Sequence, residues 1–234
     1  MKKIAIIIAD IDEYKNLYSL LPKNAEETDI FGMESHKFVI KNVNGDLSVQ
    51  TVCCGIGKVN AAVAGAFLVQ NGFDLVVSGG LSGGLNGVTK NDIVVGNSYF
   101  EHDFDLTVLG YKPAQKPGQD YIYTSPEYLV KDIVKYFPFA KAGKFATGDG
   151  FVCSSEKRDF LVNEFDAIAC DMETSAVAYA CDRTGTEFVS IRMISDGADD
   201  EATESYKAIL NSDDVSGLWL KIIFNWLEKT EVIC

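Results

Sequence analysis

The chain has 234 residues, 47% of them hydrophobic and 24% charged, so it can bury a full core and fits one α/β domain over residues 1–234. Its 34 Asp and Glu residues against 21 Lys and Arg residues give a formal net charge of -13, which argues against nucleic acid or an anionic membrane surface as a partner. Asp10 makes the apolar run at residues 4–9 shorter than a secretory core segment, and no stretch approaches the length of a membrane span.

The first half of the chain predicts alternating strands and helices. A β-branched run at residues 3–9 predicts a strand buried on both faces, followed by a helix from about Glu13 to Leu21. Asn44 and Gly45 lie between strand patterns at residues 37–43 and 47–54, and Asn-Gly is the strongest short signal for a β-hairpin. The sheet therefore mixes parallel and antiparallel pairs. A helix and two strands follow, at residues 59–69, 73–78 and 92–100.

The second half continues the alternation. Ser125, Pro126 and Glu127 supply the N-cap, the first-turn proline and the early acid of a helix start. We expect strands at residues 144–146, 166–172 and 187–194, and a helix at residues 173–183. A last helix carries one apolar stripe that should pack against the sheet, made of Val215, Leu218, Trp219, Ile222, Ile223, Trp226 and Leu227.

The six cysteines form no Cys-x-x-Cys pair and have no histidine nearby in a zinc-binding pattern. Their scatter through apolar segments is typical of small packing residues in a reducing compartment. We therefore expect a cytoplasmic protein in which the cysteines pack in the core. They are Cys53, Cys54, Cys153, Cys170, Cys181 and Cys234.

Two carboxylates, Glu173 and Asp196, follow two successive predicted strands, at the position where open α/β sheets build active sites. This placement favours acid/base chemistry. The alternative is that Glu173 is a first-turn acid favoured by the helix dipole and that Asp196 is a helix N-cap. These residues alone leave both interpretations open.

Glycine-rich segments follow two of the predicted strands. Residues 55–58 lack the third glycine of a dinucleotide fingerprint and the residue order of a P-loop. The glycine-rich run at residues 79–85 would let a ligand approach the backbone closely, or would form a tight crossover turn. A tight phosphate site usually recruits guanidinium groups, and the chain has only three arginines, Arg158, Arg183 and Arg192.

Seven short motifs, taken in order and spacing, resemble the purine nucleoside phosphorylase and nucleosidase superfamily, and within it the 5′-methylthioadenosine/S-adenosylhomocysteine nucleosidases. They are residues 3–9 with Glu13, 55–59, 83–85 with 92–95, 102–105 with Thr107 and 110–111, 148–152, 171–173, and 194–196 with 198–199. The resemblance covers almost the whole chain. It implies a three-layer α/β/α single domain whose mixed central sheet partly closes into a barrel, and a homodimer.

The resemblance also implies hydrolysis of the bond between ribose and adenine, through a ribosyl cation like that of glycoside hydrolysis. Asp196 would protonate N7 of the departing adenine, although an unperturbed Asp has a pKa near ~3.9 and would need burial to act as an acid. Glu173 would accept hydrogen bonds from the ribose hydroxyls, and Glu13 would deprotonate the attacking water. No metal or organic cofactor is implied.

Further residues carry over as binding residues for a nucleoside. Phe151 would stack on adenine while the backbone of Val152 contacts its polar edge, and Met172 would pack against the ribose. Ser195 belongs to the family's Ser-Asp motif, and the serine of the glycine segment aligns near Leu81 or Ser82. An apolar pocket for the 5′-alkylthio group would be lined by Ile56, Leu109 and Tyr206, with Leu109 supplied by a neighbouring subunit if the protein dimerises.

Two departures from the family pattern leave the preferred 5′ group open. Asp10 stands where relatives usually carry Met, so a carboxylate would either contact a polar 5′ group or face solvent. Gly197 replaces a larger residue and would widen the base pocket. Methylthioadenosine and S-adenosylhomocysteine are the expected substrates.

The nearest alternative is phosphorolysis on the same scaffold. The related phosphorylases carry arginines near the amino terminus and before the glycine segment, whereas residues 9–12 and 77–79 contain none. Water is therefore the favoured nucleophile. A non-catalytic nucleoside-binding protein is disfavoured because Glu13, Glu173 and Asp196 are all present.

Overall fold

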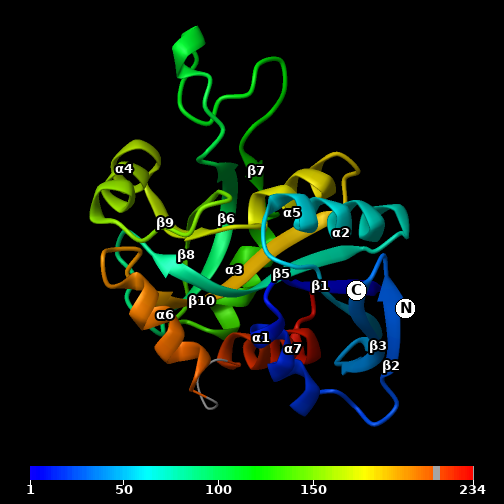
Figure 1. Ribbon diagram of the computed structural model, residues 1–234. Coiled ribbons are helices and arrows are strands. Elements are labelled where there is room, and N and C mark those ends of the chain that lie inside the picture. Colours follow the sequence, from blue (N-terminus) through cyan, green and yellow to red (C-terminus); the bar gives the residue numbers. More distant parts are fainter. Residues whose placement is uncertain (213–216, 234) are drawn as a thin grey trace.

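The computed structural model describes residues 1–212 and 217–233, in which ten strands form one mixed sheet (Figure 1). The strands are β1 (Lys3–Ile8), β2 (Glu26–Ile30), β3 (Met33–Asn42), β4 (Gly45–Cys53), β5 (Leu75–Gly84), β6 (Ile93–Glu101), β7 (Tyr123–Thr124), β8 (Lys141–Thr147), β9 (Ala167–Asp171) and β10 (Glu187–Asp196). The helices are α1 (Ile11–Tyr14), α2 (Lys58–Gln70), α3 (Glu127–Tyr136), α4 (Ser155–Phe165), α5 (Thr174–Asp182), α6 (Ala202–Leu210) and α7 (Leu218–Lys229), with 3₁₀ turns η1 (Lys15–Ser19) and η2 (Thr107–Leu109).

Part of the sheet closes into a five-strand barrel. Strand β10 pairs in parallel with β5 and antiparallel with β6, and the ring continues through β8 and β9 back to β5. Strands β1, β4, β3 and β2 extend the sheet outward from β5, and β3 and β4 form the expected hairpin. The mixed, partly barrel-closed sheet predicted from the sequence is confirmed.

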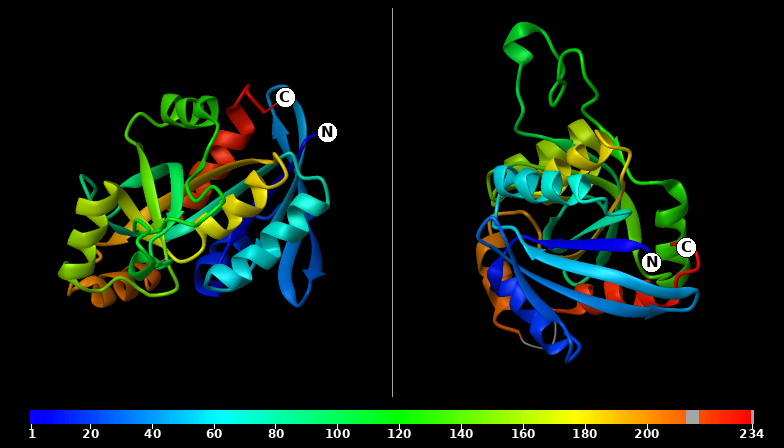
Figure 2. Two further views of the ribbon diagram at one scale, coloured as in Figure 1. Left: turned by 90° about the horizontal axis from the view of Figure 1, so that it is seen from above. Right: turned by 90° about the vertical axis from the view of Figure 1, so that its right-hand side faces the viewer.

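Helices cover both faces of the extended sheet, which makes three layers (Figure 2). Alternate residues of β1 point to opposite layers, as the two-residue period of a strand requires. Ile6 joins the core that contains Trp219 and Trp226 of α7, whereas Ile7 joins the core beneath α2 and α5. A Cβ added at Gly65 would lie 3.1 Å from the Cβ of Ala180, so α2 and α5 pack closely.

The apolar stripe of the last helix is buried as expected, except that Leu218 is 39% exposed and Val215 lies outside the described residues. Cys54, Cys170 and Cys181 are buried and Cys53 is half-buried. The packing prediction was wrong for Cys153, which is exposed, and Cys234 lies outside the described residues. In the described parts of the chain, no helix has the length and apolar character needed to cross a bilayer.

Three local predictions were wrong. The expected helix from Glu13 to Leu21 is one α-helical turn and a 3₁₀ segment, because Asn16 and Ser19 bond to nearby backbone carbonyls. Ser125 does not cap α3, since its hydroxyl lies 2.6 Å from the Tyr99 hydroxyl.

The tight crossover turn that was one alternative for residues 79–85 also does not form, since β5 continues to Gly84. A Cβ at Gly79 would lie 2.4 Å from the Trp219 ring, so these glycines allow close packing within a strand. Strands β2 and β7 and helices α4 and α6 were not predicted, and α4 buries only Leu161.

Candidate active site

One cavity of about 320 Å³ lies beside the carboxyl ends of β1, β9 and β10 and over the second half of β5. All the site residues predicted from the sequence line it except Leu109. They are Glu13, Ile56, Ser82, Phe151, Val152, Met172, Glu173, Ser195, Asp196 and Tyr206.

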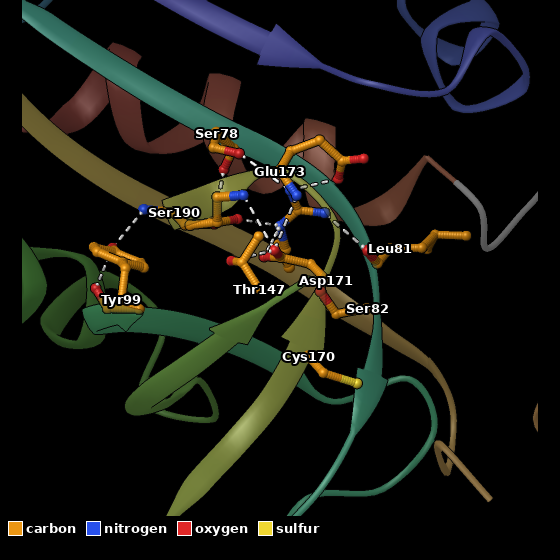
Figure 3. A network of polar contacts seen from close by, with 12 residues as sticks. Ser78, Leu81, Ser82, Tyr99, Thr147, Cys170, Asp171, Glu173 and Ser190 are labelled. Carbon is orange, nitrogen blue, oxygen red and sulfur yellow. Dashed lines mark hydrogen bonds and ion pairs between the residues drawn. The ribbon is translucent and has the colours of Figure 1, made fainter. Parts of the chain in front are cut away.

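A buried arginine lies at the floor of this cavity. Arg192 is 3% exposed, and its guanidinium lies 3.2 Å from Asp171 Oδ2 and 3.6 Å from Glu173 Oε2. It also donates to the carbonyl of Leu81 at 2.9 Å and to the hydroxyl of Ser78 at 3.2 Å. Figure 3 shows these partners converging on one centre from β5, β9 and the start of α5.

Arg192 was not predicted from the sequence as a site residue. Its available signal was its place four residues before Asp196, near the end of the predicted strand at residues 187–194. The apolar character of β10 hid this signal, since such a strand predicts core residues.

Glu13 projects from α1 toward β5 and is 6% exposed. Its Oε2 accepts a hydrogen bond of 3.0 Å from the backbone N–H of Leu81. A Cβ at Gly80 would lie 2.5 Å from that oxygen, and Gly80 has φ of +151°, so glycine is required where the acid meets the strand. Burial raises the pKa of Glu13 to about 8, against the opposing charge of Arg192.

Glu173 immediately precedes α5, yet its side chain does not cap that helix. Its Oε1 accepts a hydrogen bond of 2.8 Å from the N–H of Gly57, while Asp171 Oδ1 accepts the N–H groups of Glu173 and Thr174. The N–H groups at the start of α5 are therefore bonded by Asp171 of β9 and not by the Glu173 side chain. Burial raises the pKa of Glu173 to about 6, and Arg192 limits the increase.

Asp196 ends β10 and is 3% exposed. Its Oδ2 lies 2.7 Å from the Ser195 hydroxyl, and its Oδ1 accepts the N–H of Ala198 at 2.9 Å. It does not cap a helix, because α6 begins at Ala202 with Glu201 at the N-cap position. Burial raises the pKa of Asp196, which favours a carboxyl that can donate a proton.

The walls of the cavity are aromatic and aliphatic. Phe151 and Tyr206 lie with ring centroids 5.6 Å apart, and the Tyr206 hydroxyl donates to Asp10 Oδ2 at 3.0 Å. Val152 is buried, whereas Phe151 is 44% and Ile56 is 51% exposed at the opening. In the described part of the chain, the buried Ser82 hydroxyl makes no hydrogen bond.

Leu109 does not reach the cavity of its own chain. It belongs to η2, on the segment between β6 and β7 that projects from the body of the molecule (Figures 1 and 2), and it is 67% exposed. Placing Leu109 in this chain's own site is therefore not supported. Within residues 1–212 and 217–233, no group of three His, Cys, Asp or Glu side chains could hold a metal ion.

Comparison with known proteins assigns the chain to a family. The model of the phosphorylase superfamily matches residues 3–216. A 5′-methylthioadenosine/S-adenosylhomocysteine nucleosidase from Geobacillus kaustophilus is 35% identical over 219 residues, which cover 90% of this chain and 91% of that protein.

Solved structures show the same relationship. The nucleosidase of that name from Neisseria meningitidis, in complex with methylthio-immucillin-A, has a TM-score of 0.86 at 28% identity and covers 97% of this chain and 99% of its own. A mutant futalosine hydrolase from Helicobacter pylori has a TM-score of 0.85 at 29% identity, with coverage of 96% and 99%. The fold alone therefore does not choose the substrate. The chain belongs to the phosphorylase superfamily and, within it, to the family of 5′-methylthioadenosine/S-adenosylhomocysteine nucleosidases.

Proposed function

We propose that this protein hydrolyses the N-glycosidic bond of 5′-substituted adenosines, among them 5′-methylthioadenosine and S-adenosylhomocysteine, to adenine and a 5′-thioribose. The observation that carries the proposal is the convergence of Glu13, Glu173 and Asp196, all buried, on one cavity. The names of the relatives support the same reaction.

Asp196 is the proposed acid of the reaction. Its raised pKa keeps a proton available for N7 of adenine, so that the C1′–N9 bond can break with its electron pair passing to the base. Phe151 stacks on the adenine, and the backbone of Val152 contacts the polar edge of the base. Ser195 holds the Asp196 carboxyl in place.

Glu173 and Glu13 serve the ribose. Glu173 accepts hydrogen bonds from the ribose hydroxyls, and its negative charge favours the cation that develops at C1′, while Met172 packs against the sugar. Glu13 takes a proton from the water whose oxygen bonds to C1′. Arg192 orients Glu173 and lowers the cost of ionising both acids.

The cavity is better suited to water than to phosphate as the nucleophile. Arg192 supplies the one cationic side chain among the described residues that line it, and its guanidinium is already bonded to Ser78, Leu81, Asp171 and Thr174. A phosphate dianion would also approach several buried acids. Phosphorolysis is therefore the weaker alternative, and retention of all three acids weighs against a purely binding role.

The protein is proposed to act as a single-domain homodimer in the cytoplasm. Val108 is 90% exposed and Leu109 is 67% exposed on the projecting segment, and a second copy would cover them and receive Leu109 at its 5′ pocket. The five cysteines in the described residues are free thiols, which supports a reducing compartment. Light scattering of the wild type and of Leu109→Asp, expected to be monomeric, tests the dimer.

The reaction is tested by chromatographic detection of free base from methylthioadenosine, S-adenosylhomocysteine, adenosine and inosine, in phosphate-free buffer and again with phosphate. Equal release of adenine in both buffers is expected. Release only with phosphate, together with ribose-1-phosphate or its 5′-thio analogue, would establish a phosphorylase. No release of base under either condition would leave only a binding role.

A further inference from the structure

Two carboxylates that line the cavity take no part in the proposed reaction: Asp171, which is paired with Arg192, and Asp10. Strand β5 has β10 on one side and β1 on the other. Asp196 ends β10, and Asp10 follows β1. Since the base lies at Asp196 and the ribose acids lie between, Asp10 is at the opposite end of the cavity, toward the 5′ group of a bound nucleoside.

The Asp10 carboxylate is fixed from two sides. Its Oδ1 caps α1 by accepting the N–H of Asp12 at 2.8 Å, and its Oδ2 accepts the Tyr206 hydroxyl at 3.0 Å. Tyr206 comes from α6, so the contact joins residues 196 positions apart in the sequence at this end of the cavity. Both side chains are half-buried and line the cavity.

Among the described residues, this arrangement leaves acceptor capacity on Asp10 without a donor. A carboxylate has about four lone-pair sites, and the two bonds to Asp10 use two of them. The Tyr206 hydroxyl has given its only proton to Asp10 and presents only a lone pair. A thioether covering this end would remove water from the acid without replacing its hydrogen bonds, which is unfavourable.

We propose that Asp10 and Tyr206 select for a hydrogen-bond donor on the 5′ substituent, so that the site favours the hydroxyl of adenosine or the ammonium group of S-adenosylhomocysteine over the methylthio group. The inference rests on the proposed function, because it assumes that an adenine nucleoside occupies the cavity with its base at Asp196. It assigns a specificity role to two residues that perform no bond-breaking step.

Binding of uncleavable C-nucleosides tests the selection without any turnover. The probes are formycin A, which keeps the 5′-hydroxyl, and its 5′-methylthio derivative, with dissociation constants measured by calorimetry. In the wild type, formycin A is expected to bind about tenfold or more tightly, since a hydrogen bond to a charged group has roughly this effect. Asp10→Ser should abolish or invert that ratio, because serine keeps the helix cap while withdrawing the acceptor from the cavity.

Matched variants separate selection from a general loss of structure. Asp12→Asn removes a neighbouring carboxylate that is exposed and paired with Lys15, so its ratio of dissociation constants should equal that of the wild type. Tyr206→Phe removes the lone pair of Tyr206 and one of the two bonds that fix Asp10, so the preference for the donor should shrink without being lost. Asp10→Leu should favour the methylthio probe even if both affinities fall.

The outcomes separate the inference from the proposed function. An unchanged ratio in Asp10→Ser and Asp10→Leu would overturn the selection, whether or not the enzyme turns over, and so would a wild type that binds the methylthio probe more tightly. Binding of the probes without adenine release from any nucleoside would defeat the proposed function alone. If selection holds, kcat/KM for adenosine and S-adenosylhomocysteine, each compared with methylthioadenosine, shows which donor the site uses.

Discussion

The molecule has two clusters of charged side chains, one around Arg192 and one around Lys58, and the pKa values of their acids shift in opposite directions. Around Arg192, with a side chain 4% exposed, the nearby Glu13 and Glu173 have raised pKa values of about 8 and about 6. Around Lys58, burial alone would raise the pKa of Asp103, but its hydrogen bonds from Lys58 and from the Asp149 N–H outweigh burial and lower it.

Exposure explains the difference. Lys58 and Asp103 have side chains 17% and 31% exposed, so water still solvates their charges, whereas Glu173 is 6% exposed and loses most of its hydration. The Lys58 cluster ties the start of α2 to the end of β6 and to the turn before Phe151. Lys58 thus stabilises loops at a partly exposed position, whereas Arg192 lies beside buried acids that can donate or accept a proton.

The largest effect is expected when the buried cation is removed. Arg192→Met leaves Asp171, Glu173 and Glu13 buried without their neighbouring cation, which should cost about 3–5 kcal/mol of unfolding free energy. Urea unfolding at neutral pH measures the change. A loss below about 1 kcal/mol would mean that the cluster is not held together by this arginine.

Glu13→Gln should separate activity from stability. The amide keeps an acceptor for the Leu81 N–H but cannot take a proton from water, so kcat should fall by about 10²-fold or more. Above pH 8 the variant should unfold at higher urea concentration than the wild type, because the buried side chain at this position no longer has to ionise. Equal turnover would exclude Glu13 as the base.

The pH dependence of kcat/KM should show the raised pKa of the base. Glu13 is mostly protonated below about pH 8, so the fraction of enzyme with an ionised base rises about tenfold per pH unit until that region, while loss of the Asp196 proton opposes this rise in kcat/KM. The folded-state pKa is above the ordinary value, so the contribution of Glu13 to stability is complete below about pH 4.5 and is lost as pH rises through about 8. A pH profile of the wild type with the same shape as that of Glu13→Gln would contradict this assignment.

The smallest effect is expected at the exposed cluster. Lys58→Met should cost about 1 kcal/mol, because its ion pairs are partly solvated. The difference from the wild type should shrink in about 0.5 M NaCl, since salt screens exposed charges. A cost equal to that of Arg192→Met would remove the distinction between the clusters.

Local patterns predicted the repeating architecture but not the contacts that complete it. The period of residues 3–9 and the Asn44-Gly45 turn are local signals, and both gave the correct element. Gly79 and Gly80 of β5 are explained by Trp219 and Glu13, which approach from distant parts of the chain and leave no local signal.

The candidate site was also predicted where the signals were local and was missed where they were not. Motifs named most of the residues that line the cavity, but Arg192 was hidden in an apolar strand. The Asp10–Tyr206 bond joins residues that no short pattern connects. Leu109 lies on a segment whose proposed partner is a second copy, so the folded single chain does not place it.

The most direct test of the central proposal is adenine release from methylthioadenosine by Asp196→Asn in phosphate-free buffer, with circular dichroism as the check on folding. The amide retains the shape of the side chain but has no proton to give N7, and we expect turnover to fall by about 10²-fold or more. Turnover near that of the wild type, in a correctly folded variant, would contradict acid catalysis by the buried carboxyl at the end of β10.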